Sequence, residues 1–327
     1  MYKLAIDAMS GDLGSGVVVQ ACLQFLKSHD DTELYVTGKE EELTKLKDVP
    51  HVHIVNTRDI VAMDDGIMKV RRKRDSSMVK AVTMANDNIV DAVVSCGSTG
   101  AFYTSAMLFL KRIEGVEKSC LMAVLPTYNN KGVCMLDVGA NAQNTPQQLK
   151  DFALMGSIYA QNIRGVSQPQ VSLLNIGTEE KKGDEIHQET FQLLSHEEKL
   201  NFVGNIEGRD ILKGTTDVIV TDGFSGNIAL KTTEGTASLL MKMIKESLMS
   251  TTSGKIGALF AKNSLYSLKE RFDYKSVGGA LMMGFEKAVV KAHGASDEVA
   301  FASAMDLAYQ MVKMDVVKKM KEGLTNK

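Results

Sequence analysis

Short apolar runs alternate along this chain with longer segments whose apolar residues have helical spacing. The predicted strands are residues 4–6, 34–37, 52–55, 92–95, 121–125, 133–138, 171–176 and 218–221. Most are almost continuously apolar, which is typical of strands covered by helices on both faces. Residues 76–88 and 147–163 have helical spacing, and Phe301, Met305 and Ala308 share one face of a C-terminal helix. The alternation predicts an α/β fold with a mainly parallel sheet flanked by helices.

Residues 234–272 interrupt this alternation because they contain no convincing strand. Leu240, Met241, Ile244 and Leu248 form an apolar stripe with helical spacing, and a second helical stretch from residue 255 follows a turn rich in Ser and Thr. We therefore expect a projecting helical pair that makes a dimer interface or touches something outside the core. No low-complexity linker divides the chain, so residues 1–327 are predicted to form a single α/β unit.

Composition and charge exclude several classes of protein. The formal net charge of -2 argues against a nucleic-acid partner, since binding a phosphate backbone requires a cationic surplus. The cysteines are far apart with no C-x-x-C pair, so we expect no metal site and reduced thiols in the cytoplasm. The chain opens with a predicted strand rather than a signal peptide, and no apolar run reaches the roughly 18 residues of a membrane span. Any membrane contact is therefore expected to be peripheral.

Residues 96–101 follow the predicted strand 92–95 and precede a helix. Gly97 and Gly100 lack a Cβ and let the backbone approach an anion, while Ser98 and Thr99 add hydroxyl groups. The start of the helix also offers free N–H groups and a favourable dipole. These properties suit phosphate. A tight turn in which Thr99 caps the helix explains the same residues equally well.

Two later turns carry polar groups at strand ends. Asn141 follows the strand 133–138, and Lys182 lies in the charged loop after the strand 171–176. A lysine in such a loop can neutralise phosphate or a developing oxyanion, and one such donor contributes roughly 3 kcal/mol in a preorganised site. The ordinary alternatives are a structural Asx turn at Asn141 and a solvated loop at Lys182.

Polar residues also follow the strand 218–221 and precede it. Asp222 and Asn227 lie among small residues before a helix, and Arg209 can bind an anion through two parallel hydrogen bonds. His293, beside a glycine, is a possible proton carrier near neutral pH, although a lone histidine is more often structural.

The dense basic cluster of the chain is Arg71, Arg72, Lys73 and Arg74. It can dock an acidic protein or collect phosphate. A solvated face at the start of a helix is the alternative.

The residues of these motifs and their order resemble those of the PlsX family of acyl-carrier-protein:phosphate acyltransferases through nearly the whole chain. Residues 7–12 (DAMSGD) resemble the family's DAMGGD, residues 95–101 (SCGSTGA) are similar to SxGxTGA, and residues 136–141 (LDVGAN) are similar to LDxGAN. The further matches, in order, are LNIG at 174–177, KG at 182–183, FVGNIEGRD at 202–210, DGF at 222–224, GN at 226–227, HG at 293–294 and SD at 296–297. The nonamer at 202–210 is the most specific. Ser10 and Leu13 stand where the family usually has Gly and His, so we assign the first loop no proton transfer.

The resemblance implies transfer of a fatty acyl group from the thioester of acyl carrier protein to inorganic phosphate. The acyl phosphate would feed acylation of glycerol 3-phosphate in phospholipid synthesis. The resemblance also implies a homodimer whose fold is similar to isocitrate and isopropylmalate dehydrogenases and to phosphotransacetylase. Phosphate is itself the nucleophile, so catalysis can rest on positioning and on stabilisation of the tetrahedral oxyanion. No cofactor is expected, and the lack of a legible Ser-His-Asp triad agrees with this chemistry.

The resemblance also distributes roles among the candidate residues. Phosphate or substrate binding falls to Gly97, Ser98, Thr99, Gly100, Asp222, Asn227 and Arg209, and the catalytic group is Lys182, Asn141 and His293. Arg71, Arg72 and Arg74 are candidates for docking the acidic carrier protein. Leu259 and Phe260, with lysines nearby, predict a peripheral membrane contact where acyl phosphate would pass to a membrane acyltransferase. A buried dimer contact is the alternative for these two residues.

Three other functions compete with this interpretation. A phosphotransacylase acting on short-chain acyl-CoA uses a related fold and the same nucleophile. A dehydrogenase of the isocitrate type is disfavoured, because the sequence has neither a G-x-G-x-x-G motif nor a clear aspartate cluster for a divalent metal. A non-catalytic membrane scaffold would tolerate Lys182→Ala and Thr99→Val without loss of function.

Overall fold

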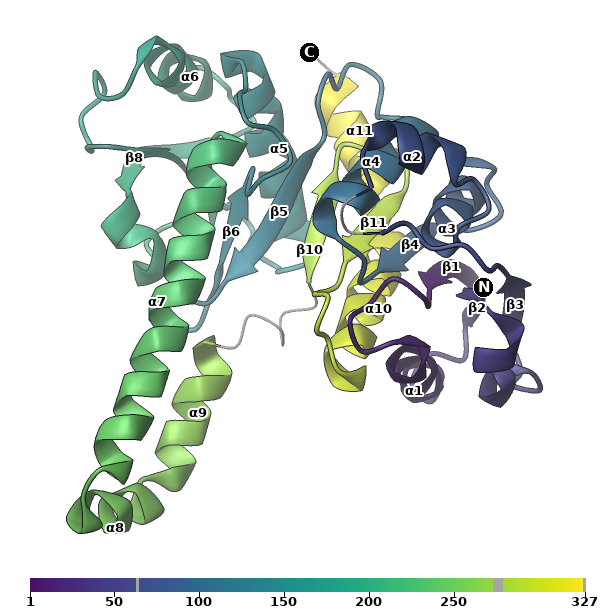
Figure 1. Cartoon of the computed structure of the whole chain (residues 1–327). Coiled ribbons are helices and arrows are strands. Elements are labelled where there is room, and N and C mark those ends of the chain that lie inside the picture. Colours follow the sequence, from purple (N-terminus) through teal and green to yellow (C-terminus); the bar gives the residue numbers. More distant parts are fainter. Residues whose placement is uncertain (63–64, 273–278, 326–327) are drawn as a thin grey trace.

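The sheet at the centre of the molecule is built from two parallel blocks. Within residues 1–62, 65–272 and 279–325, which the computed structural model describes (backbone alone at 269–272 and 325), eleven strands form one sheet in the order β3-β2-β1-β4-β11-β10-β5-β6-β9-β7-β8 (Figure 1). The strands are β1 (Tyr2–Asp7), β2 (Thr32–Gly38), β3 (Val52–Asn56), β4 (Ala92–Ser95), β5 (Cys120–Leu125), β6 (Val133–Leu136), β7 (Gln170–Asn175), β8 (Asn201–Glu207), β9 (Val218–Val220), β10 (Ala280–Met283) and β11 (Ala288–Lys291).

Helices cover both faces of this sheet (Figure 1). They are α1 (Ser15–Leu26), α2 (Ile67–Arg72), α3 (Ser77–Asn86), α4 (Thr99–Phe109), α5 (Pro146–Asn162), α6 (Glu185–Ser195), α7 (Gly223–Met249), α8 (Thr252–Phe260), α9 (Lys262–Phe272), α10 (Glu298–Lys313) and α11 (Val316–Thr325), with a 3-10 turn η3 (Gly208–Lys213) after β8. The expected α/β fold with a mainly parallel sheet is confirmed.

The two parallel blocks run in opposite directions. Strands β3, β2, β1, β4 and β11 are mutually parallel, as are β6, β9, β7 and β8. Between them, the pairings β11–β10, β10–β5 and β5–β6 are antiparallel, so three reversals separate the blocks. The carboxyl ends of the first block therefore lie at one edge of the sheet, and those of the second block lie at the opposite edge.

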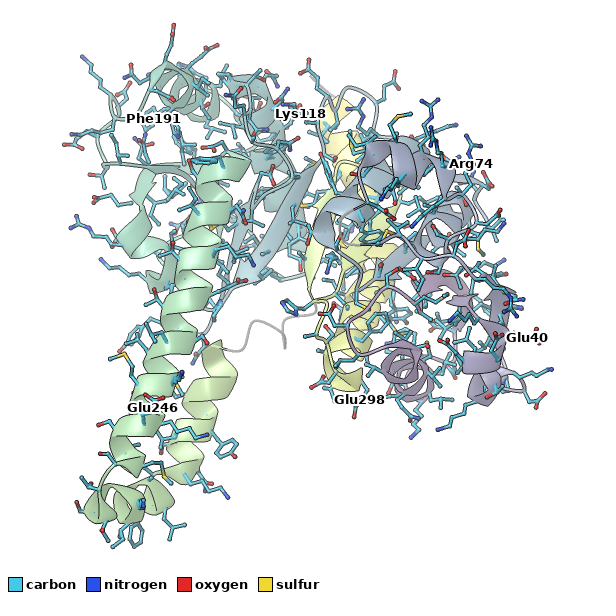
Figure 2. The ribbon with its side chains drawn as sticks, in the orientation of Figure 1. Glu40, Arg74, Lys118, Phe191, Glu246 and Glu298 are labelled. Atoms are coloured by element: carbon cyan, nitrogen blue, oxygen red, sulfur yellow. The ribbon has the colours of Figure 1, made fainter. Side chains whose placement is uncertain are left out.

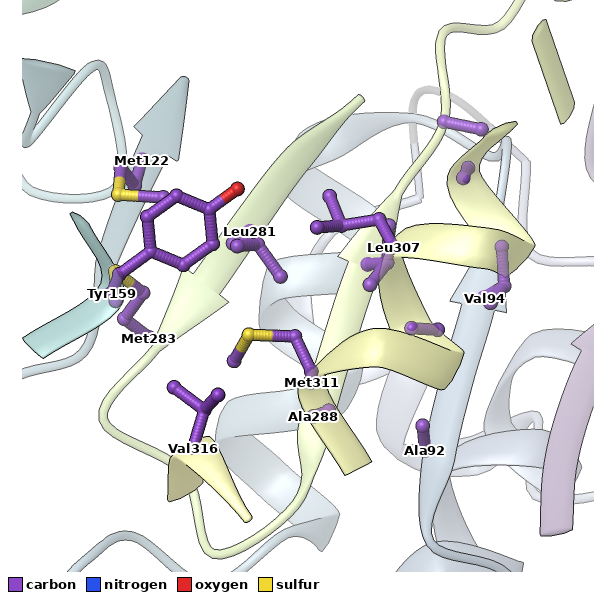
Figure 3. Close-up of a cluster of buried hydrophobic side chains, with 14 of the residues drawn as sticks. Ala92, Val94, Met122, Tyr159, Leu281, Met283, Ala288, Leu307, Met311 and Val316 are labelled. Carbon is purple, nitrogen blue, oxygen red and sulfur yellow. The ribbon is translucent and has the colours of Figure 1, made fainter. Parts of the chain in front are cut away.

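One apolar core nevertheless runs across the boundary between the blocks. Met122 from β5 and Leu281 from β10 lie in the same buried cluster as Val94 from β4 and Met311 from α10 (Figure 3). Removing a side chain of this size from water contributes roughly 1.5–3 kcal/mol. The antiparallel strands therefore join the two blocks through packed side chains as well as through the ladder.

Alternate residues of the strands face opposite layers of helices. On β1, Leu4 and Ile6 belong to the cluster that includes residues of α1, α5 and α10, whereas Ala5 belongs to the cluster under α3 and α4. Because these strands are buried on both faces, their sequences are almost continuously apolar. At the start of α5, Thr145 and Gln148 form a capping box and Pro146 occupies the first turn, which explains why the helix begins there.

Each predicted strand overlaps an observed one, and the predicted helices at 76–88 and 147–163 correspond to α3 and α5. Three strands were missed, namely β8, β10 and β11. Strand β8 contains polar Asn201, Asn205 and Glu207 and lies at the edge of the sheet, so its pattern is not continuously apolar. Strands β10 and β11 have four residues each, and they come after the helical insertion in the chain.

The projecting segment consists of three helices, not the expected pair (Figure 1). Helix α7 already begins at Gly223, and the stretch from residue 255 is divided by Ala261 into α8 and α9. With 27 residues, α7 is about 40 Å long, and its buried residues are confined to the first turns, ending at Leu230. Leu240 and Ile244 of the predicted apolar stripe are 52% and 37% exposed. Among the described helices, none has the length and apolar character needed to cross a membrane.

Candidate active site

The first group of loops follows β1, β4 and β11, at residues 8–14, 96–98 and 292–297. Asp7 and Ser95 are paired in the ladder, and Lys291 is paired with Ser95 on the other side. The hydroxyl of Ser95 donates to Asp7 Oδ2 at 2.6 Å and accepts from the backbone N–H of Gly97 at 3.1 Å. Because Asp7 and Ser95 are fully buried, this network fixes the direction in which the chain leaves β4.

The turn between β4 and α4 has the geometry of an anion site. Ser98, not Thr99, caps α4, because its Oγ accepts from the N–H of Ala101 at 3.2 Å. A Cβ at Gly97 would lie 2.8 Å from Cβ of Ser10 and would overlap the side chain of Met78, so only glycine fits. Thr99 and Gly100 are exposed, which leaves the first turn of the helix accessible.

The loop 292–297 lies against the loop 8–14. The N–H of Asp12 donates to the carbonyl oxygen of Gly294 at 3.0 Å. His293 is exposed, and its Nδ1 accepts from the N–H of Ala295 at 3.1 Å. The structure therefore brings His293 to the same loop group as the predicted phosphate turn.

The second group of loops follows β6, β7 and β9, at residues 137–145, 176–184 and 221–222. Asp137 organises the first of these. Its fully buried carboxylate accepts from the N–H groups of Leu121, Gly139, Ala140 and Asn141 and from the side chain of Asn141, at 2.8–3.0 Å. Burial raises the pKa of the Asp137 carboxyl, and the hydrogen bonds that it accepts oppose that rise.

The amide of Asn141 is engaged within the protein. Its Nδ2 donates to Asp137 Oδ2 and to the carbonyl oxygen of Ser119, both at 2.8 Å, and its Oδ1 accepts from the hydroxyl of Tyr103 at 3.3 Å. The side chain thus holds the loop in place. Asn141 is well suited to positioning its neighbours, and its amide faces protein groups rather than open space.

The start of α7 packs directly against this loop. Asp222 caps the helix, accepting from the N–H of Ser225 at 2.8 Å. A Cβ at Gly223 would lie 2.7 Å from Asp137 Oδ2, and a Cβ at Gly139 would lie 3.2 Å from Cγ of Asn227. The structure therefore places Asp222 and Asn227 beside Asn141.

Lys182 and Arg209 follow the neighbouring strands β7 and β8, at the same edge of the sheet. Strand β7 is paired with β9, and Lys182 in the loop after β7 is half exposed, with Nζ 3.8 Å from Glu179 Oε1. Arg209 follows β8 at the end of the sheet and is largely exposed. Its guanidinium lies 2.6 Å from Glu207 Oε2, and the hydrogen bond from this pair raises the pKa of Arg209.

The two loop groups meet through helix α4 rather than at one sheet edge. Ser98 precedes Tyr103 by five positions, about 7.5 Å along the helix, and Tyr103 reaches Asn141. No contact of Lys182 with Ser98 or Asn141 is described in the structure. Two surface cavities, of about 440 Å³ between α1 and α10 and about 590 Å³ beside Arg164, lie away from these loops.

The basic cluster adjoins the predicted phosphate turn through helix packing. Helix α2 carries exposed Arg71 and Arg72 and packs against α4. Arg74 lies at the surface beside these helices, with its guanidinium carbon 5.9 Å from the ring centre of Phe109 on α4 (Figure 2). Arg71 and Arg72 on α2, and Arg74 just after it, thus lie next to the helix that follows the predicted phosphate turn.

Leu259 and Phe260 lie at the far end of the projecting helices. They are 72% and 85% exposed, and because they are consecutive in the chain, two large apolar side chains are exposed together at this end. Side chains along these helices, including that of Glu246, spread away from the sheet (Figure 2).

Four groups of the site were not among the sequence predictions, namely Asp7, Ser95, Tyr103 and Lys291. Asp7 and Ser95 stand at the ends of predicted strands, so their position was a usable signal. Tyr103 could not be recognised from the sequence, because it lies inside a helix and not at the end of a strand. Lys291 was missed together with β11. Among the described residues, no group of three or more His, Cys, Asp or Glu side chains could hold a metal ion.

Comparisons with known proteins identify the family of the chain and the fold that it shares. The sequence model of the family described as "Fatty acid synthesis protein" matches residues 2–319. Phosphate acyltransferases of Macrococcus caseolyticus and Streptococcus agalactiae are 41% and 42% identical over 327 and 329 residues, covering all of each chain. That of Bacillus thuringiensis is 42% identical over 317 residues, covering 96% of each chain.

Among solved structures, EutD phosphotransacetylase from Staphylococcus aureus superimposes with a TM-score of 0.58 at 15% identity, covering 97% of this chain and 94% of that one. A 4-hydroxythreonine-4-phosphate dehydrogenase from Salmonella typhimurium gives a TM-score of 0.54 at 12% identity, covering 95% and 100%. These likenesses confirm the expected similarity of fold to phosphotransacetylase. Full-length identity above 40% decides the family, so this chain is an acyltransferase and belongs to the fatty acid synthesis protein family, the PlsX-type phosphate acyltransferases.

Proposed function

We propose that this phosphate acyltransferase takes its acyl group from a fatty acyl thioester of acyl carrier protein. Inorganic phosphate attacks the thioester carbonyl carbon through one of its oxygens, and a tetrahedral oxyanion forms. When this intermediate collapses, the carbon–sulfur bond breaks and the thiolate of the carrier takes up a proton. The products are acyl phosphate and free acyl carrier protein, and the acyl phosphate would then serve acylation of glycerol 3-phosphate.

The observation that carries the proposal is the link between the two loop groups. The open first turn of α4 offers N–H groups to phosphate, and Tyr103, five positions after Ser98, holds Asn141 of the second group. A nucleophile held at one group and a carbonyl held near the other need no acylated side chain, because positioning alone supplies a large part of the rate.

Lys182 is the group best placed to stabilise negative charge in the second loop group. It is half exposed and its nearest carboxylate oxygen, on Glu179, is 3.8 Å away, so its ammonium group can turn toward a ligand. Asp222 and Asn227 line the neighbouring loop, and Asn141 keeps that loop in position. His293, exposed beside the phosphate turn, is the candidate for protonating the leaving thiolate.

The decisive experiment combines the purified protein, palmitoyl-acyl carrier protein and ³²P-labelled phosphate. We expect labelled acyl phosphate and an equal amount of free carrier thiol. Acyl chains from C4 to C18 on the carrier are compared in parallel, so that an unsuitable acyl length is not mistaken for absence of the reaction. Absence of label in acyl phosphate at every chain length, with a correctly folded protein, would rule out the proposed reaction.

A second candidate function is phosphotransacylation of short-chain acyl-CoA. It is favoured by the structural likeness to EutD phosphotransacetylase, which uses the same overall fold. The two functions separate in one assay, in which acetyl-CoA and long-chain acyl carrier thioester compete for the same enzyme. A kcat/KM for acetyl-CoA that exceeds the value for the carrier substrate would favour this second function.

The acidic carrier protein would dock on Arg71, Arg72 and Arg74. These residues lie on and beside α2, which packs against α4, so a carrier bound there would have its thioester near the phosphate turn. Opposite charges at such a surface also speed up association at low salt.

The projecting helices would bring the enzyme to a cytoplasmic membrane surface. Leu259 and Phe260 are exposed apolar side chains at the tip, and Lys255 and Lys262 nearby can interact with anionic lipid headgroups. Acyl phosphate could there pass to a membrane acyltransferase. The exposed apolar stripe of α7 would meanwhile form the interface of a homodimer, and we expect no nucleic-acid partner.

A further inference from the structure

Lys291 is a buried cation beside the first loop group. It is the last residue of β11, it is paired with Ser95 in the ladder, and only 8% of its surface is exposed. Its position is one residue from the loop that contains His293 and adjacent to the strand that leads into Ser98. A lysine is rarely buried without a charged partner, so its presence here requires an explanation.

The described residues provide Lys291 with no direct counter-ion. Its Nζ donates to the carbonyl oxygen of Ala292, and none of the ion pairs among the described residues includes it. The nearby charges are those of Asp7, Asp12 and Lys231. Asp7 already accepts hydrogen bonds from Ser95 and from the backbone of Met9. A buried ammonium group without an anion in contact is costly, and a bound anion would remove that cost.

A second polar group of the same loops lacks a partner. The buried hydroxyl oxygen of Ser10 has no hydrogen-bond partner among the described atoms, and Cβ of Ser10 lies beside the backbone of Gly97. The accessible first turn of α4 adds unpaired N–H groups in the same turn. The ammonium group of Lys291, the hydroxyl of Ser10 and the N–H groups of the first turn of α4 can therefore all donate to a ligand. Phosphate provides several acceptor oxygens together with negative charge.

We propose that Lys291 binds the phosphate substrate, holding it against the first turn of α4 as the nucleophile of the acyl transfer. The proposal rests on the proposed function and names a residue that directly contacts its phosphate. Lys231 of α7, which comes from the second block, interacts electrostatically with Lys291, so an anion held here lies where the two blocks approach each other.

The charge of Lys291 depends on pH in the range where enzymes are assayed. Burial, together with the positive charge of Lys231, lowers its pKa to about 8, although Cys96, Asp12 and Asp7 act in the opposite direction. The thiol of Cys96 remains neutral in this range because burial raises its pKa to about 12. Lys291 is therefore charged at pH 7 and loses its proton as the pH rises through about 8, so phosphate binding should weaken above that pH.

The test compares Lys291→Met, which removes the charge, with Lys291→Arg, which retains it. Lys150→Met serves as the matched control, because Lys150 is also largely buried and loses an ion pair with Glu197 at 2.6 Å. KM for phosphate and KM for the acyl carrier thioester are measured separately at pH 7. We expect Lys291→Met to raise KM for phosphate at least roughly tenfold while KM for the thioester changes less than about twofold, with partial recovery in Lys291→Arg.

A binding measurement makes the result independent of turnover. Inorganic phosphate at increasing concentration should raise the Tm of the wild type and of Lys150→Met, but not that of Lys291→Met. Sulfate is the comparison anion. An equal phosphate-dependent rise of Tm in Lys291→Met, or an unchanged KM for phosphate, would overturn the assignment even if the wild type makes acyl phosphate. If the wild type makes none while its Tm still responds through Lys291, the site holds phosphate and the proposed reaction is wrong.

Discussion

The hydroxyl of Tyr103 donates a hydrogen bond of 3.3 Å to Oδ1 of Asn141, and this bond joins helix α4 to the loop after β6. The same hydroxyl lies 3.1 Å from Oγ of Ser119 and 3.2 Å from the Ser119 carbonyl oxygen. Burial raises the pKa of Tyr103, so the hydroxyl keeps its proton and remains a donor throughout the usual pH range. The two candidate loop groups are thereby held at a fixed distance although they lie at opposite sheet edges.

Tyr103→Phe should weaken this link without emptying the space that the ring fills. The net contribution of one hydrogen bond to stability is about 1 kcal/mol, so we expect the free energy of unfolding to fall by that amount. If the same energy is lost in the transition state, kcat falls by up to about tenfold. Urea unfolding and steady-state kinetics provide the two values. Unchanged kcat in a variant that is measurably less stable would show that the link supports folding alone.

Lys182→Ala should lower kcat by a factor of about 10² to 10³, because one donor to a developing oxyanion is removed. Lys181→Ala is the control, since the neighbouring lysine is also exposed and carries the same charge. We expect the Tm of both variants to stay close to that of the wild type. Equal activity of the two variants would remove Lys182 from the catalytic group.

Charge reversal of Arg71, Arg72 and Arg74 to Glu should raise KM for acyl carrier thioester by at least about tenfold at low salt. The effect should shrink as ionic strength rises, because salt screens exposed charges. KM for phosphate is the internal control and should stay constant. Arg58→Glu, at another exposed position, is the matched variant. A carrier KM that responds equally to Arg58→Glu would indicate a general charge effect.

Replacing both Leu259 and Phe260 with Asp distinguishes a membrane contact from a dimer contact at the tip. We expect binding to vesicles containing anionic lipid to fall at least about tenfold, since two apolar side chains no longer enter the interface. Sedimentation equilibrium should give the same oligomeric state as the wild type. Dissociation of the oligomer with vesicle binding intact would assign the tip to the dimer instead. Leu13→Asp, at an exposed apolar position in the first loop group, serves as the control for added charge.

Lys291 should make the stability of the protein depend on alkaline pH. Its ordinary pKa of 10.5 falls to about 8 in the folded chain, so between these values the unfolded chain binds more protons. The stability of the wild type relative to Lys291→Met should therefore increase as the pH rises from 8 to 10.5, by about 3 kcal/mol in total. Chemical unfolding of both proteins at intervals of pH measures this difference. A constant difference across the range would contradict the lowered pKa.

The sequence predicted most of the strands because they are covered on both faces. Their runs of Val, Ile and Leu need no neighbouring information to be recognised, as β1 and β4 illustrate. Strand β8 was not predicted, because it is the last strand of the sheet and tolerates polar residues such as Asn205. The predicted polar turns at Ser98, Asn141 and Asp222 likewise occur at strand ends, where glycine and capping residues are required locally.

Apolar runs along the chain thus determined the fold class, and glycine and capping residues at strand ends determined the candidate turns. The order of the motifs along the chain determined the family. Only the tertiary structure decided which turns meet, because strand direction depends on pairing between residues far apart in the sequence. The antiparallel pairings of β10 with β11 and β5, and of β5 with β6, place the turn at Ser98 and the loop at Asn141 on opposite edges. The parallel pairing of β11 with β4 places Lys291 next to Ser95, and no local pattern reveals that a lysine at this position will be removed from water.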